Sequence, residues 1–117
     1  MCSLNRLIIS FVQHGFIELA SALEENTTLR ELDLAGNSFE SLEALEKFNE
    51  SFKKNRNLKI LNLAACRLDG KSIRIIAPSL CQHRSLERLH LDGNPIDRGL
   101  KYVRINLCKL FTLFYSY

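Results

Sequence analysis

Three segments of the sequence repeat one eleven-residue pattern, and this repeat limits the folds open to the chain more than any other feature. The segments are residues 29–39, 58–68 and 86–96, so they recur at nearly even spacing. Each has leucine at its first, fourth and sixth positions and a large apolar residue at its eleventh. The ninth position holds Asn37, Cys66 or Asn94. Such a regular recurrence predicts a solenoid, in which each unit packs against its neighbours.

The segments between the patterns carry apolar residues at helical spacing. In the first segment they follow i, i+3, i+4 and i+7, which marks one face of a helix: Phe16, Leu19, Ala20 and Leu23. Similar sets follow in the next two units: Leu45, Phe48, Asn49 and Phe52, then Ile73, Ile76, Ala77 and Leu80. Each unit is predicted to be a short strand, a turn and a helix of about three turns, closed at Asn26, Asn55 or His83. Pro78 lies inside the third helix and is expected to kink or shorten it.

Alternation along each strand separates a core face from a solvent face. The leucines of Leu-x-x-Leu-x-Leu point between strand and helix, and the residues between them point to the other side. The ninth position lies where the chain leaves the sheet, so an amide at Asn37 or Asn94 can satisfy backbone groups there. Cys66, with its weak S–H donor, is expected to do part of the same work.

The pattern Leu-x-x-Leu-x-Leu-x-x-Asn/Cys-x-Leu, with its period of 28 to 29, resembles the leucine-rich repeat family. The alternation of Asn37, Cys66 and Asn94 is similar to the ribonuclease-inhibitor-like subclass, found in intracellular inhibitors, NOD-like receptors and Ran GTPase-activating proteins. This resemblance implies an α/β solenoid, a short right-handed horseshoe with parallel strands on the concave face and helices on the convex face. It also implies a protein-interaction module.

On that fold the residues between the leucines form columns across the concave face. These are the predicted partner-binding residues: Arg30, Lys59 and Glu87; Glu31, Ile60 and Arg88; Asp33, Asn62 and His90; and Asp92, beside Ala35 and Ala64. Both charge signs and small side chains are mixed there, which suits a protein surface better than a small-molecule pocket. The structural positions are Asn37, Cys66 and Asn94.

The whole of 1–117 is interpreted as one domain. Its parts are a degenerate first unit or N-terminal cap (1–28), repeats at 29–57 and 58–85, and a last repeat with a C-terminal helix (86–117). Extending the period backwards aligns Met1, Leu4, Arg6, Ile9 and Phe11 with the pattern positions of the later repeats, which puts charged Arg6 in the core. After Gly99, Leu100, Val103, Leu107, Leu110 and Phe114 keep helical spacing. The apolar tail 110–117 is either a packed last helix, a partner-binding, self-associating or membrane-surface segment, or the cut edge of a longer solenoid.

Composition narrows the function classes. Sixteen Lys and Arg against thirteen Asp and Glu leave a charge of +3, too small for a nucleic-acid binder. No window approaches the roughly 18 apolar residues of a membrane span, and no signal peptide is evident. The four cysteines show no zinc spacing, so free thiols in the cytoplasm are expected. No nucleophile and base stand at a useful spacing, so we expect no enzyme, metal or cofactor.

Two alternatives to a protein-binding module stay open. One is a regulator of a small GTPase that acts in trans, as some similar repeat proteins do, with Arg30 or Arg6 as the contributing residue. The other is a structural fragment of a larger leucine-rich repeat receptor.

Overall fold

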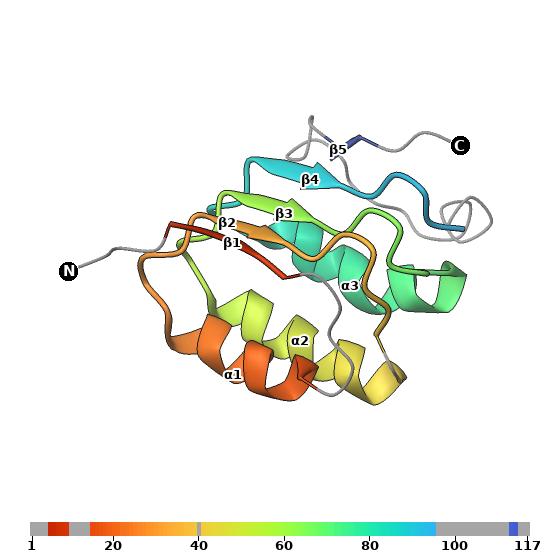
Figure 1. The fold of residues 1–117 in the computed structure, drawn as a ribbon, viewed down its shortest axis with the longest axis horizontal. Coiled ribbons are helices and arrows are strands. Elements are labelled where there is room, and N and C mark those ends of the chain that lie inside the picture. The colour runs from red at the N-terminus through yellow and green to blue at the C-terminus, as the bar shows by residue number, and fades with distance from the viewer. Residues whose placement is uncertain (1–4, 10–14, 40, 96–112, 115–117) are drawn as a thin grey trace.

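The fold has two layers, a parallel sheet and a row of helices on one side of it (Figure 1). The computed structural model describes residues 5–9, 15–39, 41–95 and 113–114. Along the chain the elements are β1 (Arg6–Ile8), α1 (Phe16–Glu25), β2 (Glu31–Asp33), α2 (Leu42–Lys54), β3 (Ile60–Asn62), α3 (Gly70–Gln82), β4 (Arg88–His90) and β5 (Leu113–Phe114). The predicted α/β fold with parallel strands is confirmed.

The strands lie in chain order, and every neighbouring pair is parallel. Glu31 pairs with Ile60, and Ile60 pairs with Arg88. Each of these pairs is separated by one period of the sequence repeat. The repeat therefore places equivalent residues side by side, as the columns require.

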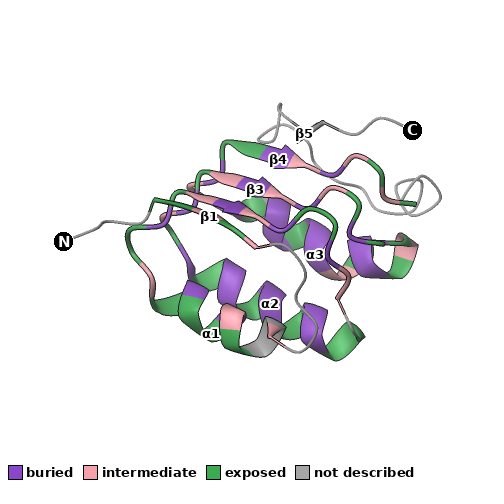
Figure 2. Ribbon diagram, in the orientation of Figure 1, coloured by how far each residue is buried: buried purple, intermediate pink, exposed green. Residues whose placement is uncertain are grey.

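The leucines of the pattern form the core between sheet and helices. All nine are at most 6% exposed: Leu29, Leu32, Leu34, Leu58, Leu61, Leu63, Leu86, Leu89 and Leu91. Phe48 and Phe52 of α2 pack against them with their rings 6.2 Å apart. Figure 2 shows buried residues along the sides of helix and strand that face each other. Leucine supplies the strand side of the core in each repeat, and side chains from the helices fill the rest.

Capping residues fix where the helices begin and end. The Ser41 hydroxyl accepts a hydrogen bond from the Ala44 amide at 3.1 Å, and the Asp69 carboxylate accepts one from the Ser72 amide at 3.0 Å. Each satisfies an amide that the first helical turn leaves without a partner. The helices end at Asn26, Asn55 and His83, as predicted.

The predicted register of the first strand is wrong. The period aligned Arg6 with the core residue Leu34, but Arg6 pairs with Glu31 and Leu7 pairs with Leu32. Arg6 therefore lies on the exposed side, and Leu7 packs against the core in its place. A shift by an odd number of positions turns every side chain of a strand over, and burial selects the register that keeps the guanidinium in water. Met1, Leu4 and Phe11 lie outside the described residues.

One expectation for the later part of the chain is also corrected, and of the kink or shortening expected at Pro78 the shortening is not found. Leu113 and Phe114 form a short strand parallel to β4, so the helix expected from the apolar spacing does not extend to Phe114. Pro78 does not shorten α3, which has 13 residues like α2. Pro78 lies in an exposed position, where water can reach the backbone of the preceding helical turn. Leu100, Val103, Leu107 and Leu110, with the rest of the tail, lie outside the described residues.

Candidate binding surface on the sheet

We refer to the side of the sheet that faces away from the helices as the sheet face. It carries the predicted partner-binding residues, and the register holds three of the columns together: Glu31, Ile60 and Arg88; Asp33, Asn62 and His90; Arg30, Lys59 and Glu87. Ala64 and Asp92 lie in the turns that follow β3 and β4, linked by a hydrogen bond from the Ala65 amide to the Asp92 carbonyl.

Ion pairs between neighbouring strands use four charges of the sheet face. The Arg6 guanidinium lies 2.9 Å from the Glu31 carboxylate, and the Lys59 ammonium lies 3.2 Å from the Glu87 carboxylate. Both pairs are exposed to solvent, so each contributes at most about 1 kcal/mol to stability. Their larger effect is to neutralise charge on the surface that a partner would meet.

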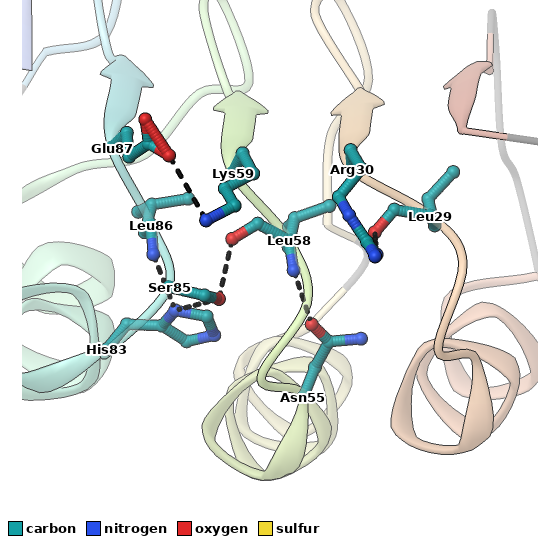
Figure 3. Close-up of polar contacts among 9 residues, drawn as sticks. All are labelled: Leu29, Arg30, Asn55, Leu58, Lys59, His83, Ser85, Leu86 and Glu87. Carbon is teal, nitrogen blue, oxygen red and sulfur yellow. Dashed lines mark hydrogen bonds and ion pairs between the residues drawn. The ribbon is translucent and has the colours of Figure 1, made fainter.

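The Arg30 side chain is turned back toward the loop before β2. Its Nη1 donates hydrogen bonds to the carbonyls of Thr27 at 2.9 Å and Leu29 at 3.4 Å (Figure 3). The guanidinium therefore braces the loop between α1 and β2. Although Arg30 is predicted to bind a partner, its guanidinium is bonded within its own loop.

Asp33 and Asn62 are engaged in the turns at the ends of their strands. The Asp33 Oδ1 accepts from the Ala35 amide and the Asn62 Oδ1 from the Ala64 amide, each at 3.0 Å. A side chain bonded to the backbone two residues on is the Asx turn, which supports the chain as it leaves the sheet. These two residues shape the surface and are poor probes of binding.

Arg88 and Asp92 differ from the other charges of this face. Within the described part of the chain, neither side chain forms a hydrogen bond or an ion pair. Arg88 is exposed, while Asp92 and Ile60 are half-buried. These three side chains are therefore available for a partner on the side of β3 and β4.

Sequence reasoning missed Ile8, which the corrected register places on the sheet face beside Asp33. Ile8 is 58% exposed, and among the described large apolar residues the only other one classed as exposed is Leu42 at 43%. A constant period does not predict this position of Ile8, because the first unit is shorter than the others. The alternation of Leu7 and Ile9 with their neighbours in the sequence is the signal that could have found it.

A hydrogen-bonded ladder runs across the repeats where the chain leaves the strands. The Asn37 Nδ2 donates to the carbonyl of Ile9 at 2.7 Å, and the Asn94 Nδ2 donates to that of Leu63 at 2.8 Å. In the repeat between them, the Cys66 Sγ lies 3.1 Å from the Leu34 carbonyl. Each ninth-position side chain thus binds a carbonyl of the preceding repeat.

Burial determines the chemistry of the Cys66 thiol. It is a free thiol, 1% exposed, and desolvation raises its pKa to about 11. A thiol that stays protonated is a hydrogen-bond donor and a poor nucleophile. The other three cysteines fall outside the described side chains.

A second ladder joins the repeats at the opposite ends of the strands. The Asn55 Nδ2 donates to the Leu23 carbonyl at 2.8 Å. The Ser85 hydroxyl donates to the Leu58 carbonyl at 2.7 Å (Figure 3). His83 takes the place of Asn55 in the next repeat, and its Nδ1 accepts from the Leu86 amide at 3.2 Å. The two ladders hold both ends of the strands to their neighbours.

The imidazole of His83 is buried in a neutral form. It stacks on Phe52 with ring centroids 4.1 Å apart, and its buried Nε2 forms no hydrogen bond with the described residues. Burial lowers the pKa of His83, and Arg56 acts in the same direction. Backbone groups of Asn55 and Phe52 lie close enough to oppose this shift without reversing it.

Two clefts in the described part of the chain lie away from the sheet face. One of about 220 Å³ is lined by residues before and within α2 and α3, including Leu42, Arg67 and Asp69. Another of about 250 Å³ lies along α2 between Glu43 and Glu50. Among the described residues, no three His, Cys, Asp or Glu side chains are grouped to hold a metal ion, and no helix is long and apolar enough to cross a membrane.

Comparison with known proteins agrees with this geometry. A family model described as Leucine Rich repeat matches residues 25–42 and 54–76, which cover the β2 and β3 strands and the turns after them. This chain carries leucine-rich repeats. The matched segments include the core leucines of the first two repeats and the ladder residues Asn37 and Cys66.

Two curated proteins are similar to this chain in sequence. Protein TORNADO 1 of Arabidopsis thaliana is 36% identical over 80 residues, which cover 68% of this chain and 6% of that protein. NACHT, LRR and PYD domains-containing protein 13 of Homo sapiens is 35% identical over 108 residues, 92% of this chain and 10% of that protein. The chain therefore spans a tenth or less of the length of these relatives.

A solved structure shows the same arrangement of the repeats. The structure of leiomodin-1 actin-binding site 2 superposes with a TM-score of 0.73 at 20% sequence identity, covering 97% of this chain and 70% of that one. At that identity the likeness is one of fold. Leucine-rich repeats in general mediate contacts between proteins, and the question for this chain is which surface it uses.

Proposed function

We propose that the chain is a non-catalytic protein-interaction module that binds a partner protein through the sheet face. The observation that carries the proposal is the separation of roles along each strand. Leucines take all the buried positions, while Ile60, Arg88 and Asp92 are held in register on the outside with no structural task among the described residues. A rigid sheet that presents uncommitted polar and apolar side chains together is suited to a protein surface.

The finer parts of the proposal follow from the same features. The ribonuclease-inhibitor-like subclass is supported by the alternation of Asn37, Cys66 and Asn94 and by the regular period of the strand pairing. A cytoplasmic location is supported by the free, buried thiol of Cys66. Self-association through the tail 110–117 is a separate hypothesis, which a measurement of oligomeric state at several concentrations tests.

A GTPase-regulating role is the alternative, and the geometry does not favour it. An arginine that reaches the partner's nucleotide is one way to fill such a role, and the two candidates for it are Arg6 and Arg30. The Arg6 guanidinium is paired with Glu31, and that of Arg30 is bonded to two carbonyls of its own loop. Service as one segment of a longer leucine-rich repeat receptor is compatible with the main proposal, because the sheet face would be continuous with that of its neighbours.

A matched pair of substitutions tests the sheet face. Peptides selected from a displayed library on the immobilised wild-type chain are measured against Ile60→Glu and Leu42→Glu. Both changes replace a partly exposed apolar residue by a carboxylate, but Leu42 lies on α2, away from the sheet face. We expect most selected peptides to lose at least tenfold in affinity for Ile60→Glu and less than twofold for Leu42→Glu.

Urea denaturation of both variants provides the folding control, since each should unfold within about 1 kcal/mol of the wild type. The proposal fails when the folded Ile60→Glu variant binds the selected peptides as tightly as the wild type does.

A further inference from the structure

Charge on the sheet face is sorted along the strand direction. Arg6, Arg30, Lys59 and Arg88 all lie at the first residue of a strand or just before it. Asp33 and Asp92 lie at or after the last residue of one. Because all the strands are parallel, these residues form a band at the N-terminal ends of the strands, in which the basic residues outnumber Glu31 and Glu87, and an acidic band at the C-terminal ends.

Internal pairing leaves this polarity concentrated on one side. Glu31 neutralises Arg6, and Glu87 neutralises Lys59, while Arg30 is bonded to its own loop. In the acidic band, Asp33 is held by its turn. Among the described residues, the charges that stay uncommitted are Arg88 at the start of β4 and Asp92 in the turn after it.

The residues beside these two charges suit a close contact. We define the β3–β4 patch as Ile60, Asn62, Ala64, Arg88, His90 and Asp92. Ile60 is the register partner of Arg88 and offers an apolar contact next to it. Ala64 lies beside Asp92 and leaves room there, because its side chain is a single methyl group.

We propose that the β3–β4 patch binds a protein segment of matching polarity, with an acidic side chain against Arg88 and a basic side chain against Asp92. An apolar side chain of the same segment would pack on Ile60. A segment of opposite polarity would place like charges together at both ends, and such juxtaposition lowers affinity for wrong partners. This inference rests on the proposed function, since it specifies which partner the sheet face accepts.

Exchanging the two charges tests the inference. The double variant Arg88→Glu/Asp92→Lys keeps the net charge and reverses the polarity of the patch. Peptides selected on the wild type should contain both an acidic and a basic residue, and the double variant should bind them about tenfold more weakly. Copies of those peptides with acidic and basic residues exchanged should recover most of the loss on the double variant.

The matched control is the exchange Lys59→Glu/Glu87→Lys. It also keeps the net charge and lies on the same face, but it swaps two charges that already neutralise each other. We expect wild-type peptides to bind this control within twofold.

Peptides that bind the polarity-reversed variant unchanged, yet lose binding to Ile60→Glu, would overturn this inference and leave the sheet face as the binding surface. Peptides that bind every sheet-face variant unchanged would overturn both proposals.

Discussion

At the scale of single residues, the ninth position of each repeat shows how one site tolerates two chemistries. Asn94 makes four side-chain hydrogen bonds, two through Nδ2 to the carbonyls of Leu63 and Leu91 and two through Oδ1 from the amides of Cys66 and Leu68. The thiol of Cys66 lies near only two carbonyls, those of Leu34 and Ala64. The amide is therefore expected to contribute more to stability than the thiol.

Alanine substitutions should reproduce this order. We expect Asn94→Ala to lower the free energy of unfolding by about 2–4 kcal/mol and Cys66→Ala by about 1–2 kcal/mol, because buried carbonyls lose their donors in both. Urea denaturation at pH 7 measures both. Asn57→Ala is the control, since the Asn57 side chain forms no hydrogen bond with the described residues and its loss should matter by less than about 0.5 kcal/mol. Equal losses for all three variants would contradict the ladder.

At the scale of elements, α3 contains a proline in its interior, which a substitution can remove. Pro78 lacks the amide that would bind the carbonyl of Arg74, yet the helix continues to Gln82. Replacing an interior helical proline restores a hydrogen bond and removes a steric conflict.

We expect Pro78→Ala to raise the free energy of unfolding by about 1–2 kcal/mol, the gain in the helix being offset in part by a more flexible unfolded chain. The midpoint of urea denaturation measures the effect, with Gln82→Ala as a neutral control in the same helix. A lower midpoint for Pro78→Ala would mean that the proline ring makes contacts that stabilise α3.

The elements also show how far the sequence could lead. The inner strands β2, β3 and β4 were predictable because every core position is a leucine, so one register alone buries them all. The outer strands were not, because the pairing of β1 and β5 departs from the period of the inner repeats and neither strand has a complete pattern. The columns of the sheet face followed from the period. Which charges pair did not follow, since the contact of Arg6 with Glu31 depends on the shifted register of β1.

At the scale of the whole molecule, the stack depends on links between repeats at both ends of the strands, and His83, which lies beside the link from Ser85 to Leu58, titrates. The neutral Nδ1 of His83 accepts from the Leu86 amide where α3 leads into β4. A proton on Nδ1 would remove that bond and place a charge in a buried site between Phe52 and the second ladder. Protonation should therefore loosen the last repeat from the others.

The direction of the pH effect follows from the lowered pKa of His83. The unfolded chain takes up the proton near pH 6.5, and the folded chain does so only at lower pH. The stability that neutral His83 contributes is fully present above pH 6.5, and it is lost as the pH falls through the pKa of His83 in the folded chain. Asp69, whose pKa is lowered from 3.8 by its bonds to Ser72, titrates well below this range.

We expect His83→Asn, which installs the residue found at position 55, to flatten this dependence. Urea midpoints of both proteins between pH 7.5 and pH 5 measure the difference. If the difference between the urea midpoints of the two proteins stays constant across this range, protonation of His83 does not affect stability.

The turns that follow the strands constrain how this surface can be varied. Asp33 and Asn62 belong as much to the backbone as to the sheet face, since each holds the amide two residues on. A randomised library that leaves both fixed and varies 59, 60, 87, 88 and 92 would change recognition while sparing the folding of the chain. In each repeat, the residues that could set binding specificity are thus distinct from those that hold the backbone. The binding specificity of the sheet face can therefore be changed while the core and the turns are kept.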